Sequence, residues 1–315
     1  MLRRALYAAA GWLATAVLTT ALAQTPTKIT VLHTGGAPYM ASFVAKDQGF
    51  FAKRGLDVDF KLAQNGSVIV AALVAGSAQI GLPTATVILQ AVDNGLDVVL
   101  LACNNQYPEK TQSGLLARTG SNIHAAKDLE GKKVGVPGIG GFLDIVLRKW
   151  LADNGVDVRR VNFVETTLAQ SADILKSGNV DAVASLDPFL GRAVAAGVGY
   201  VAANYTSTLP DGTITGGYTS TREWATGNPK AVIAFREALL EALDYIKDNE
   251  ASARESLVRY TGLPPQVVAT LAIPNLAVRV TPDQMQFWVD VAKQQNLIQG
   301  TPDPKRIVWP WNEAR

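Results

Sequence analysis

The residues best suited to bind a small molecule lie in short turns, each directly after a predicted strand. Thr34 and Gly35 follow the first strand, and Gly140 and Gly141 follow a later one. Glycine lets a ligand approach the backbone closely, and successive N–H groups in such a turn can donate hydrogen bonds to ligand oxygens. The chemistry that these residue types predict is recognition of a polar group by hydrogen bonds.

The candidate ligand-binding residues extend this pattern to neighbouring turns and strand ends. Thr84 and Thr86 combine hydroxyls with the N–H groups at a helix start, which together can bind an anionic head group. Several candidates have a purely structural alternative, because His33 can be hydrogen bonded inside the fold and Thr84 or Asp187 can cap a helix. The full set is His33, Thr34, Gly35, Tyr39, Thr84, Thr86, Asn105, Gly140, Gly141, Phe142, Asp187 and Tyr218.

No lysine or arginine occurs in these turns, whereas two acids do. Asp187 precedes Pro188, and Asp144 lies in the first turn of a predicted helix, where an acid interacts well with the helix dipole. A dianion would meet both carboxylates and no cation, so we expect a monoanionic, zwitterionic or neutral ligand. Nearby aromatic side chains favour an apolar or aromatic portion in that ligand. They are Tyr39, Tyr107, Phe142, Phe189 and Tyr218.

The sequence offers little for catalysis or metal binding. It has one cysteine, Cys103, and two histidines, His33 and His124, which stand far apart. We find neither a metal-ligand spacing nor a Ser-His-Asp order. The glycines at positions 138, 140 and 141 do not complete the G-x-G-x-x-G fingerprint of dinucleotide binding, because the third glycine of that pattern is missing. We therefore expect no enzymatic activity, no cofactor and no metal.

The first 23 residues have the layout of a secretory signal peptide. Arg3 and Arg4 form a basic start, residues 5–18 are apolar, and Ala21-Leu22-Ala23 supplies small residues for cleavage. We expect cleavage after Ala23 and a soluble periplasmic protein. A lipid anchor is not expected, because Cys103 lies far from the cleavage site. A retained membrane anchor is the alternative, and the shortness of the apolar stretch disfavours it.

The charge balance argues against a nucleic-acid partner. The chain has 29 lysines and arginines against 27 acids, and Arg3 and Arg4 account for the difference. Residues 24–315 are therefore formally neutral, without the basic excess that nucleic-acid binding favours. At 315 residues and 48% hydrophobic content, the chain is long enough to form two lobes.

Short β-rich runs alternate with helical patterns along most of the chain. This alternation predicts mostly parallel sheets flanked by helices, with ligands bound beyond the carboxyl ends of the strands. The predicted strands are Lys28–His33, Val58–Leu62, Ala78–Leu82, Val98–Ala102, Lys133–Pro137, Val161–Thr166 and Ala182–Leu186, with two β-like pieces near 199–222. The predicted helices are 39–54, 67–75, 84–92, 141–153, 168–177 and 188–196, and helices continue from Asn228-Pro229 onwards.

Six passages form an ordered set over most of residues 28–260. They are Gly49-Phe50-Phe51 with Gly55-Leu56-Asp57-Val58, Leu73–Gly81, Asp128–Pro137, Gly178–Ala182, Asp187-Pro188-Phe189 and Asn228–Ala238. The set resembles the sulfonate-, nitrate- and taurine-binding proteins of ABC importers. It also resembles their thiamine-pyrimidine-binding relatives.

The resemblance implies a type II periplasmic binding protein of the α/β class. Each of its two lobes would be a mostly parallel sheet flanked by helices, with the ligand cleft between the lobes. Hinges near Gly114–Arg118 and Gly217–Thr221 would divide the chain into lobe 1, residues 24–115 and 220–315, and lobe 2, residues 116–219. The implied partners are a small-molecule ligand and an ABC permease with its ATPase, and we expect a monomer.

The resemblance leaves three alternatives open. One is a binding protein for a thiamine-precursor pyrimidine or another heterocyclic vitamin. Another is a periplasmic sensor that passes its ligand to a receptor. The third is a biosynthetic enzyme of the same fold, similar to the yeast-type thiamine pyrimidine synthase. The single cysteine disfavours that enzyme, which uses a cysteine-rich motif.

Overall fold

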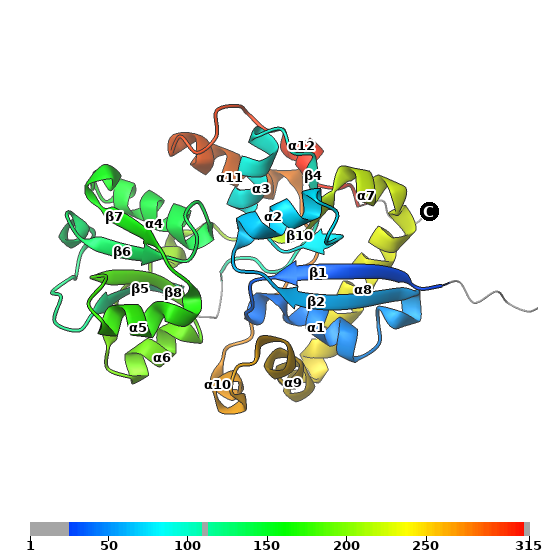
Figure 1. The fold of residues 1–315 in the computed structure, drawn as a ribbon, viewed down its shortest axis with the longest axis horizontal. Coiled ribbons are helices and arrows are strands. Elements are labelled where there is room, and N and C mark those ends of the chain that lie inside the picture. Colours follow the sequence, from blue (N-terminus) through cyan, green and yellow to red (C-terminus); the bar gives the residue numbers. More distant parts are fainter. Residues whose placement is uncertain (1–24, 109–112, 312–315) are drawn as a thin grey trace, which may run out of the picture.

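Two five-stranded sheets, each flanked by helices, build the protein and lie side by side (Figure 1). The computed structural model describes residues 25–108 and 113–311. The strand order is β2-β1-β3-β10-β4 in the first sheet and β7-β6-β8-β5-β9 in the second. We call the first sheet with its helices the first lobe, and the second sheet with its helices the second lobe. The predicted two-lobed α/β fold is confirmed, and the predicted signal peptide at 1–23 lies outside the described residues.

Both sheets are mostly parallel. β1 runs parallel to β2 and β3, and β6 runs parallel to β7 and β8. β10 is antiparallel to β3 and β4, and β5 is antiparallel to β8 and β9. The first sheet consists of β1 (Thr27–His33), β2 (Leu56–Leu62), β3 (Ile80–Gly81), β4 (Val98–Cys103) and β10 (Gly217–Thr221). The second consists of β5 (Ser113–Arg118), β6 (Lys133–Val136), β7 (Asn162–Glu165), β8 (Ala182–Leu186) and β9 (Gly199–Ala203).

The helices are divided unequally between the lobes, and the C-terminal ones join the first lobe (Figure 1). The first lobe has α1 (Met40–Asp47), α2 (Gly66–Val74), α3 (Ala85–Asp93), α7 (Arg222–Gly227), α8 (Pro229–Asp248), α9 (Glu250–Thr261), α10 (Pro265–Thr270), α11 (Pro282–Gln294) and α12 (Pro304–Ile307). The second has α4 (Phe142–Asp153), α5 (Ser171–Lys176) and α6 (Phe189–Ala195). Within residues 25–108 and 113–311, no helix has both the length and the apolarity to cross a membrane.

Local sequence explains where these elements form. β4 is buried along its full length, as expected for a strand covered on both faces of its sheet. α8 begins at Pro229 directly after Asn228, as the Asn-Pro pair predicts, because proline fits the first helical position. Its buried face includes Val232, Phe235 and Leu239. This spacing of three and four residues fixes one side of α8 against the core.

Two predicted elements are longer than the observed ones. α1 ends at Asp47, and a short 3-10 turn follows at Ala52–Arg54, so the predicted helix 39–54 is wrong in its middle. Gly49 has φ +72 between the two pieces, a left-handed conformation that ends an α-helix. The predicted strand Ala78–Leu82 is reduced to Ile80–Gly81.

The chain passes between the sheets after β4 and again after β9. β5 belongs wholly to the second sheet and β10 wholly to the first. The predicted lobe boundaries, after residues 115 and 219, fall within these two strands. The assignment of 24–115 and 220–315 to one lobe and 116–219 to the other stays a prediction.

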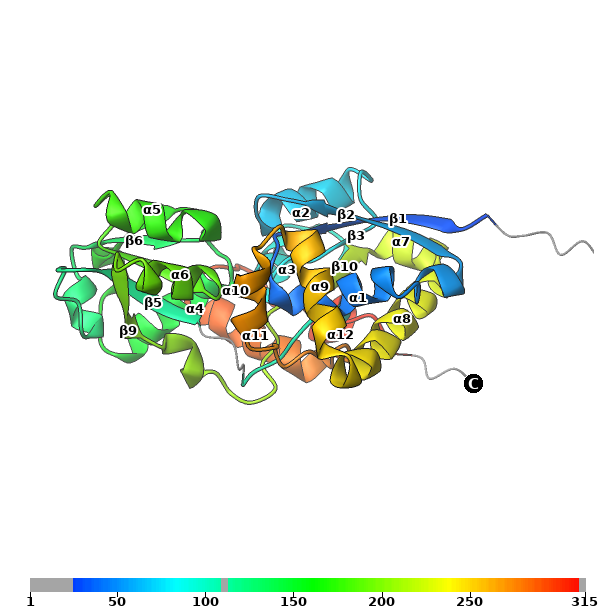
Figure 2. The ribbon, with the colours of Figure 1, turned by 90° about the horizontal axis from the view of Figure 1, so that it is seen from below.

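The two lobes share one hydrophobic cluster. It includes Val87 of α3, Phe142 of α4 and Trp288 of α11, all buried. α11 lies beside α3 within the first lobe, close to the second, and the view from below shows it near α4 (Figure 2). The lobes therefore meet along a packed seam in this structure.

Candidate ligand-binding cleft

Six strand ends from the two lobes meet at one cavity of about 620 Å³. Residues after β1, β2 and β3 line it from the first lobe, and residues after β6, β7 and β8 line it from the second. These are the carboxyl ends of parallel strands, where open α/β sheets bind their ligands. The cavity is therefore the strongest candidate for a binding site.

The turn after β1 is held by contacts within the first lobe. The Gly35 N–H donates to His33 Nδ1 at 3.1 Å, and the hydroxyls of Thr34 and Tyr39 are hydrogen bonded at 2.9 Å. Gly35 has φ +81, a conformation that glycine adopts at little cost. The Tyr39 ring meets the edges of His33 and Phe43. The turn thus presents Thr34, Gly35 and Tyr39 from a frame that belongs to its own lobe.

The turn after β6 is instead bonded across to the first lobe. Its Gly140 carbonyl accepts hydrogen bonds from Thr86 Oγ1 at 2.8 Å and from Gln90 Nε2 at 3.3 Å, both on α3. Gly138 and Gly140 have φ +90 and +77, so this turn also needs glycine. The position of this cavity wall therefore depends on the contact between the lobes.

Aromatic and aliphatic side chains from both lobes line the cavity. Phe142 stacks on Tyr107 with ring centres 5.8 Å apart. Leu62 of the first lobe is 65% exposed and Ile139 of the second is 54% exposed, and both also line the cavity. Exposed apolar groups of this size often mark a binding surface. The predicted aromatic residues in the lining are Tyr39, Tyr107, Phe142 and Phe189.

Most of the predicted site residues lie in this lining. Asp187 lines the cavity, and its Oδ1 accepts the Gly191 N–H at 3.0 Å in the first turn of α6, as its predicted capping role requires. Asn105 Oδ1 accepts a hydrogen bond from the Thr215 hydroxyl, which fixes its amide. The predicted residues that the structure brings together here are Thr34, Gly35, Tyr39, Thr84, Asn105, Gly141, Phe142 and Asp187.

Four predicted site residues lie behind the lining. His33 is 1% exposed and takes the structural alternative, with burial lowering its pKa to about 4. Tyr218 is fully buried, with its ring against Phe235, and burial raises its pKa. Thr86 and Gly140 are bonded to each other, so their polar groups hold the lobes together.

Asp144 also does not face the cavity, which corrects its predicted place on the cleft. It is 1% exposed and accepts the Gly140 N–H at 2.8 Å and Arg148 Nε at 2.7 Å. Burial raises the pKa of this carboxyl, while the charge of Arg148 opposes that shift. Asp144 therefore fixes the turn after β6 from behind.

Two segments of the lining were missed by the sequence analysis. They lie at the carboxyl ends of β2 and β7 and contribute Asn65, Glu165 and Thr166. The available signal was their position, because both segments follow strands whose ends meet the other strand ends at the cleft. Among the described residues, no lysine, arginine or histidine lines the cavity, in agreement with the cation-free turns of the sequence.

The histidines and the cysteine are poorly placed for catalysis. Cys103 is buried and burial raises its pKa to about 12, which keeps the thiol protonated. His124 stacks on Tyr200 in the second lobe, away from the cavity lining. Within the described part of the chain, no three His, Cys, Asp or Glu side chains group as a metal would need.

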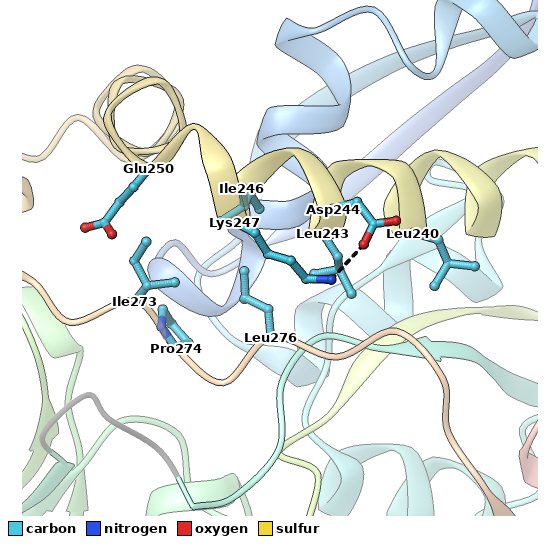
Figure 3. A pocket seen from close by; sticks show the side chains of 9 residues that line it. All are labelled: Leu240, Leu243, Asp244, Ile246, Lys247, Glu250, Ile273, Pro274 and Leu276. Carbon is cyan, nitrogen blue, oxygen red and sulfur yellow. Dashed lines mark hydrogen bonds and ion pairs between the residues drawn. The ribbon is translucent and has the colours of Figure 1, made fainter.

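A second cavity of about 530 Å³ lies under the end of α8 (Figure 3). Two charged side chains at its rim form an ion pair with each other, in which Lys247 Nζ donates to Asp244 Oδ1 at 2.8 Å. Its lining comes from the first lobe alone and includes none of the strand ends. Its apolar wall consists of Leu240, Leu243, Ile246, Ile273, Pro274 and Leu276. The cleft between the lobes is the better candidate, because both lobes contribute to it.

A family model described as NMT1/THI5 like matches residues 37–253. A protein of Brucella abortus (strain 2308), named only as a binding protein, is 28% identical over 207 residues. That match covers 64% of this chain and spans 61% of the length of the Brucella protein, which is less than two thirds.

Solved structures with a similar fold include an alkanesulfonate-binding protein and a nitrate-binding protein. The alkanesulfonate-binding protein SsuA from Xanthomonas axonopodis pv. citri, bound to MOPS, has a TM-score of 0.76 and 22% identity, over 91% of this chain and 99% of that one. The periplasmic nitrate-binding protein NrtA from Synechocystis PCC 6803 has a TM-score of 0.76 and 18% identity, over 90% of this chain and 85% of that one. At these identities the likeness is one of fold.

Proposed function

The chain belongs to the NMT1/THI5-like family, and from that membership we propose that it is the periplasmic solute-binding component of an ABC importer. The observation that carries the proposal is the cavity between the lobes, where six strand ends meet. A solute in that position contacts both lobes and can draw them together. The closed form would then dock on a membrane permease, whose ATPase drives import.

We propose a small organic solute with an apolar or aromatic body as the ligand. Tyr39, Tyr107, Phe142 and Phe189 supply an aromatic lining, while Thr84 and Asn105 supply polar groups. Ligand pockets commonly combine a mostly apolar lining with a few placed polar groups. A sulfonate, a taurine-like zwitterion, a carboxylate and a heterocyclic vitamin precursor all fit this description, and they differ in the charge of the polar group.

An enzyme of the same fold is less well supported by the site. A covalent mechanism needs an activated nucleophile with a base in reach. Cys103 has a raised pKa and is buried, and His33 Nδ1 accepts the Gly35 N–H in the turn behind the lining. The residues that do reach the cavity are suited to binding.

A thermal-shift screen of protein beginning at Gln24 tests solute capture. The panel should include alkanesulfonates, taurine, nitrate, aromatic carboxylates, riboflavin and thiamine pyrimidines. A ligand at 100 times its Kd raises the free energy of unfolding by about 2.7 kcal/mol, which a melting curve resolves. Small-angle scattering with the best binder should show a smaller radius of gyration, because the solute bridges both lobes. An unchanged radius at confirmed saturation would count against hinge closure.

Export is tested separately by cell fractionation. The mature protein should be in the periplasmic fraction and begin at Gln24, since residues 1–23 read as a signal peptide. N-terminal sequencing that finds Met1 retained would contradict this part of the proposal.

A further inference from the structure

The charged side chains that line the cleft are both acidic and both come from the second lobe. Glu165 is the last residue of β7, and Asp187 follows β8. The nearby cation Arg148 is already engaged, because its Nε lies 2.7 Å from Asp144 Oδ1 and its guanidinium covers the Phe163 ring. The second-lobe wall therefore carries negative charge, without a lysine, arginine or histidine among the described lining residues to offset it.

Glu165 is held in place across the cleft by Asn65. Asn65 Oδ1 accepts the Val68 N–H at 3.0 Å at the start of α2, which turns its amide nitrogen outward. That nitrogen donates to Glu165 Oε1 at 3.3 Å, from the first lobe to the second. A carboxylate has about four acceptor positions, so the Asn65 bond leaves Glu165 with further capacity to accept.

Thr166 adds an independent sign that a ligand belongs at this wall. It lines the cavity beside Glu165 and is 8% exposed. Its buried hydroxyl has no hydrogen-bond partner among the described residues. Buried hydroxyls are nearly always paired, so an unpaired one at a cavity wall needs an explanation, and a bound ligand would supply one.

We infer that the second-lobe wall selects a solute carrying a positively charged nitrogen, namely an organic amine that is protonated at neutral pH. This inference rests on the proposed function of solute capture. An ammonium group has donors and no acceptor, which matches the Glu165 carboxylate, and charge-assisted hydrogen bonds are the strong ones. The rings of Tyr39, Tyr107, Phe142 and Phe189 suit the same cation, because aromatic faces attract positive charge. A carboxylate or sulfonate without an amine would instead face two like charges.

Matched probes test the charge of the solute directly. Tryptamine, tryptophol and indole-3-acetate share one ring system and differ in the terminal group, as do phenethylamine, phenethyl alcohol and phenylacetate. By calorimetry, each amine should bind about tenfold or more tightly than its alcohol, with the carboxylate weakest. Equal binding of amine and alcohol, or tightest binding of the carboxylate, overturns the inference and leaves solute capture standing. If neither these probes nor the wider thermal-shift panel binds, the proposed function fails and the inference falls with it.

Glu165→Gln assigns the preference to this wall. Glutamine keeps the size of the side chain and removes its charge, so amine binding should weaken more than alcohol binding, and the preference for amine over alcohol should fall to about threefold or less. Glu255→Gln on the exposed side of α9 is the matched control and should keep the full preference. Thr166→Val should weaken amine binding about threefold, because it removes the unpaired hydroxyl. An amine preference that survives Glu165→Gln in a variant with a wild-type melting curve overturns the assignment.

Discussion

The turn after β1 and the turn after β6 both join glycines to an aromatic residue, and they face the same cavity from opposite lobes. In the first, Tyr39 contacts Thr34, His33 and Phe43 of its own lobe. In the second, the Gly140 carbonyl accepts two hydrogen bonds from α3 of the other lobe, and Phe142 packs against Trp288 of α11. Similar local sequence therefore builds a fixed wall on one side and a wall coupled to the lobe contact on the other.

The difference matters for a protein that closes on its ligand. The first turn can keep its shape whether the lobes are together or apart, because its frame is internal. The second turn loses partners when the lobes separate. We expect substitutions in the second turn to change both ligand affinity and lobe arrangement, and substitutions in the first turn to act locally.

Phe142→Ala should have the largest effect. Phe142 is 8% exposed and contacts both Tyr107 and Trp288, so truncation leaves a cavity in the seam between the lobes. Phenylalanine-to-alanine changes of this kind cost about 3–5 kcal/mol of stability. Urea denaturation measures the cost, and scattering from the ligand-free protein should show a larger radius of gyration. Tyr39→Ala is the matched change in the first turn and should leave that radius unaltered. A radius that changes with Tyr39 and stays constant with Phe142 would reverse the comparison.

His33 provides a pH test of the first turn. Burial lowers its folded-state pKa to about 4, against about 6.5 in the unfolded chain. Between these values the unfolded state binds more protons, so His33 contributes stability that is complete above pH 6.5 and lost as the pH falls towards 4. The loss from this one group is about 3 kcal/mol, since each pKa unit corresponds to about 1.4 kcal/mol.

His33→Asn separates this effect from the carboxyl groups that also titrate at low pH. The asparagine oxygen can still accept the Gly35 N–H, which keeps the turn. The free energy of unfolding, measured from pH 7 to pH 4, should fall by about 3 kcal/mol less in the variant than in wild type. Parallel curves for the two proteins would show that His33 already titrates normally in the fold.

Gly140→Ala and Gly138→Ala compare two residues of the second turn. Both have positive φ, so each alanine brings backbone strain of about 1 kcal/mol or more. At position 140 the new Cβ would lie 2.8 Å from Gln90 Nε2 of the other lobe, which is too close, whereas at 138 its nearest neighbour in that lobe, Asn65 Cβ, is 4.0 Å away. We expect Gly140→Ala to weaken ligand binding about tenfold more than Gly138→Ala. Calorimetry with any confirmed ligand measures this, and equal losses would remove Gly140 from the lobe contact.

Much of the fold could be predicted from the sequence, because the signals were local. The Asn228-Pro229 start, the continuous apolar sequence of β4 and the glycines that follow several helices act over a few residues. The interruption at Gly49 was also local, yet the apolar spacing on both sides of it favoured one continuous helix. The apolar periodicity favoured a continuous helix, whereas the glycine favoured a helix end. The left-handed conformation of Gly49 ends the helix there.

The site was harder to predict because a side chain's partner can lie far away in the chain. Asp144 reads as a helix-start acid facing the ligand, but Arg148 and the Gly140 N–H bind it from behind. Thr86 reads as a ligand hydroxyl, and its partner is a carbonyl 54 residues later. Glu165 carried no motif at all, although its place at the carboxyl end of a parallel strand already pointed to the cleft.

Thr86→Val and Thr84→Val should give the smallest effects. They best separate the contact between the lobes, made by Thr86, from the lining of the cavity, to which Thr84 belongs. The two hydroxyls lie 3.1 Å apart on the same turn of chain, yet Thr84 lines the cavity while Thr86 donates to the Gly140 carbonyl. Valine keeps the shape and removes one hydrogen bond, which is worth about 1 kcal/mol.

The predicted consequences of the two changes differ in kind. Thr86→Val weakens the lobe contact, so the ligand-free protein should have a larger radius of gyration and lower stability by about 1 kcal/mol. The Gln90 bond to the same carbonyl remains and limits the change. Thr84→Val should keep the wild-type radius and lower ligand affinity about fivefold, because 1 kcal/mol corresponds to that factor. If Thr84→Val opens the lobes as far as Thr86→Val does, the two hydroxyls act as one network, and the wall cannot be separated from the lobe contact at this point.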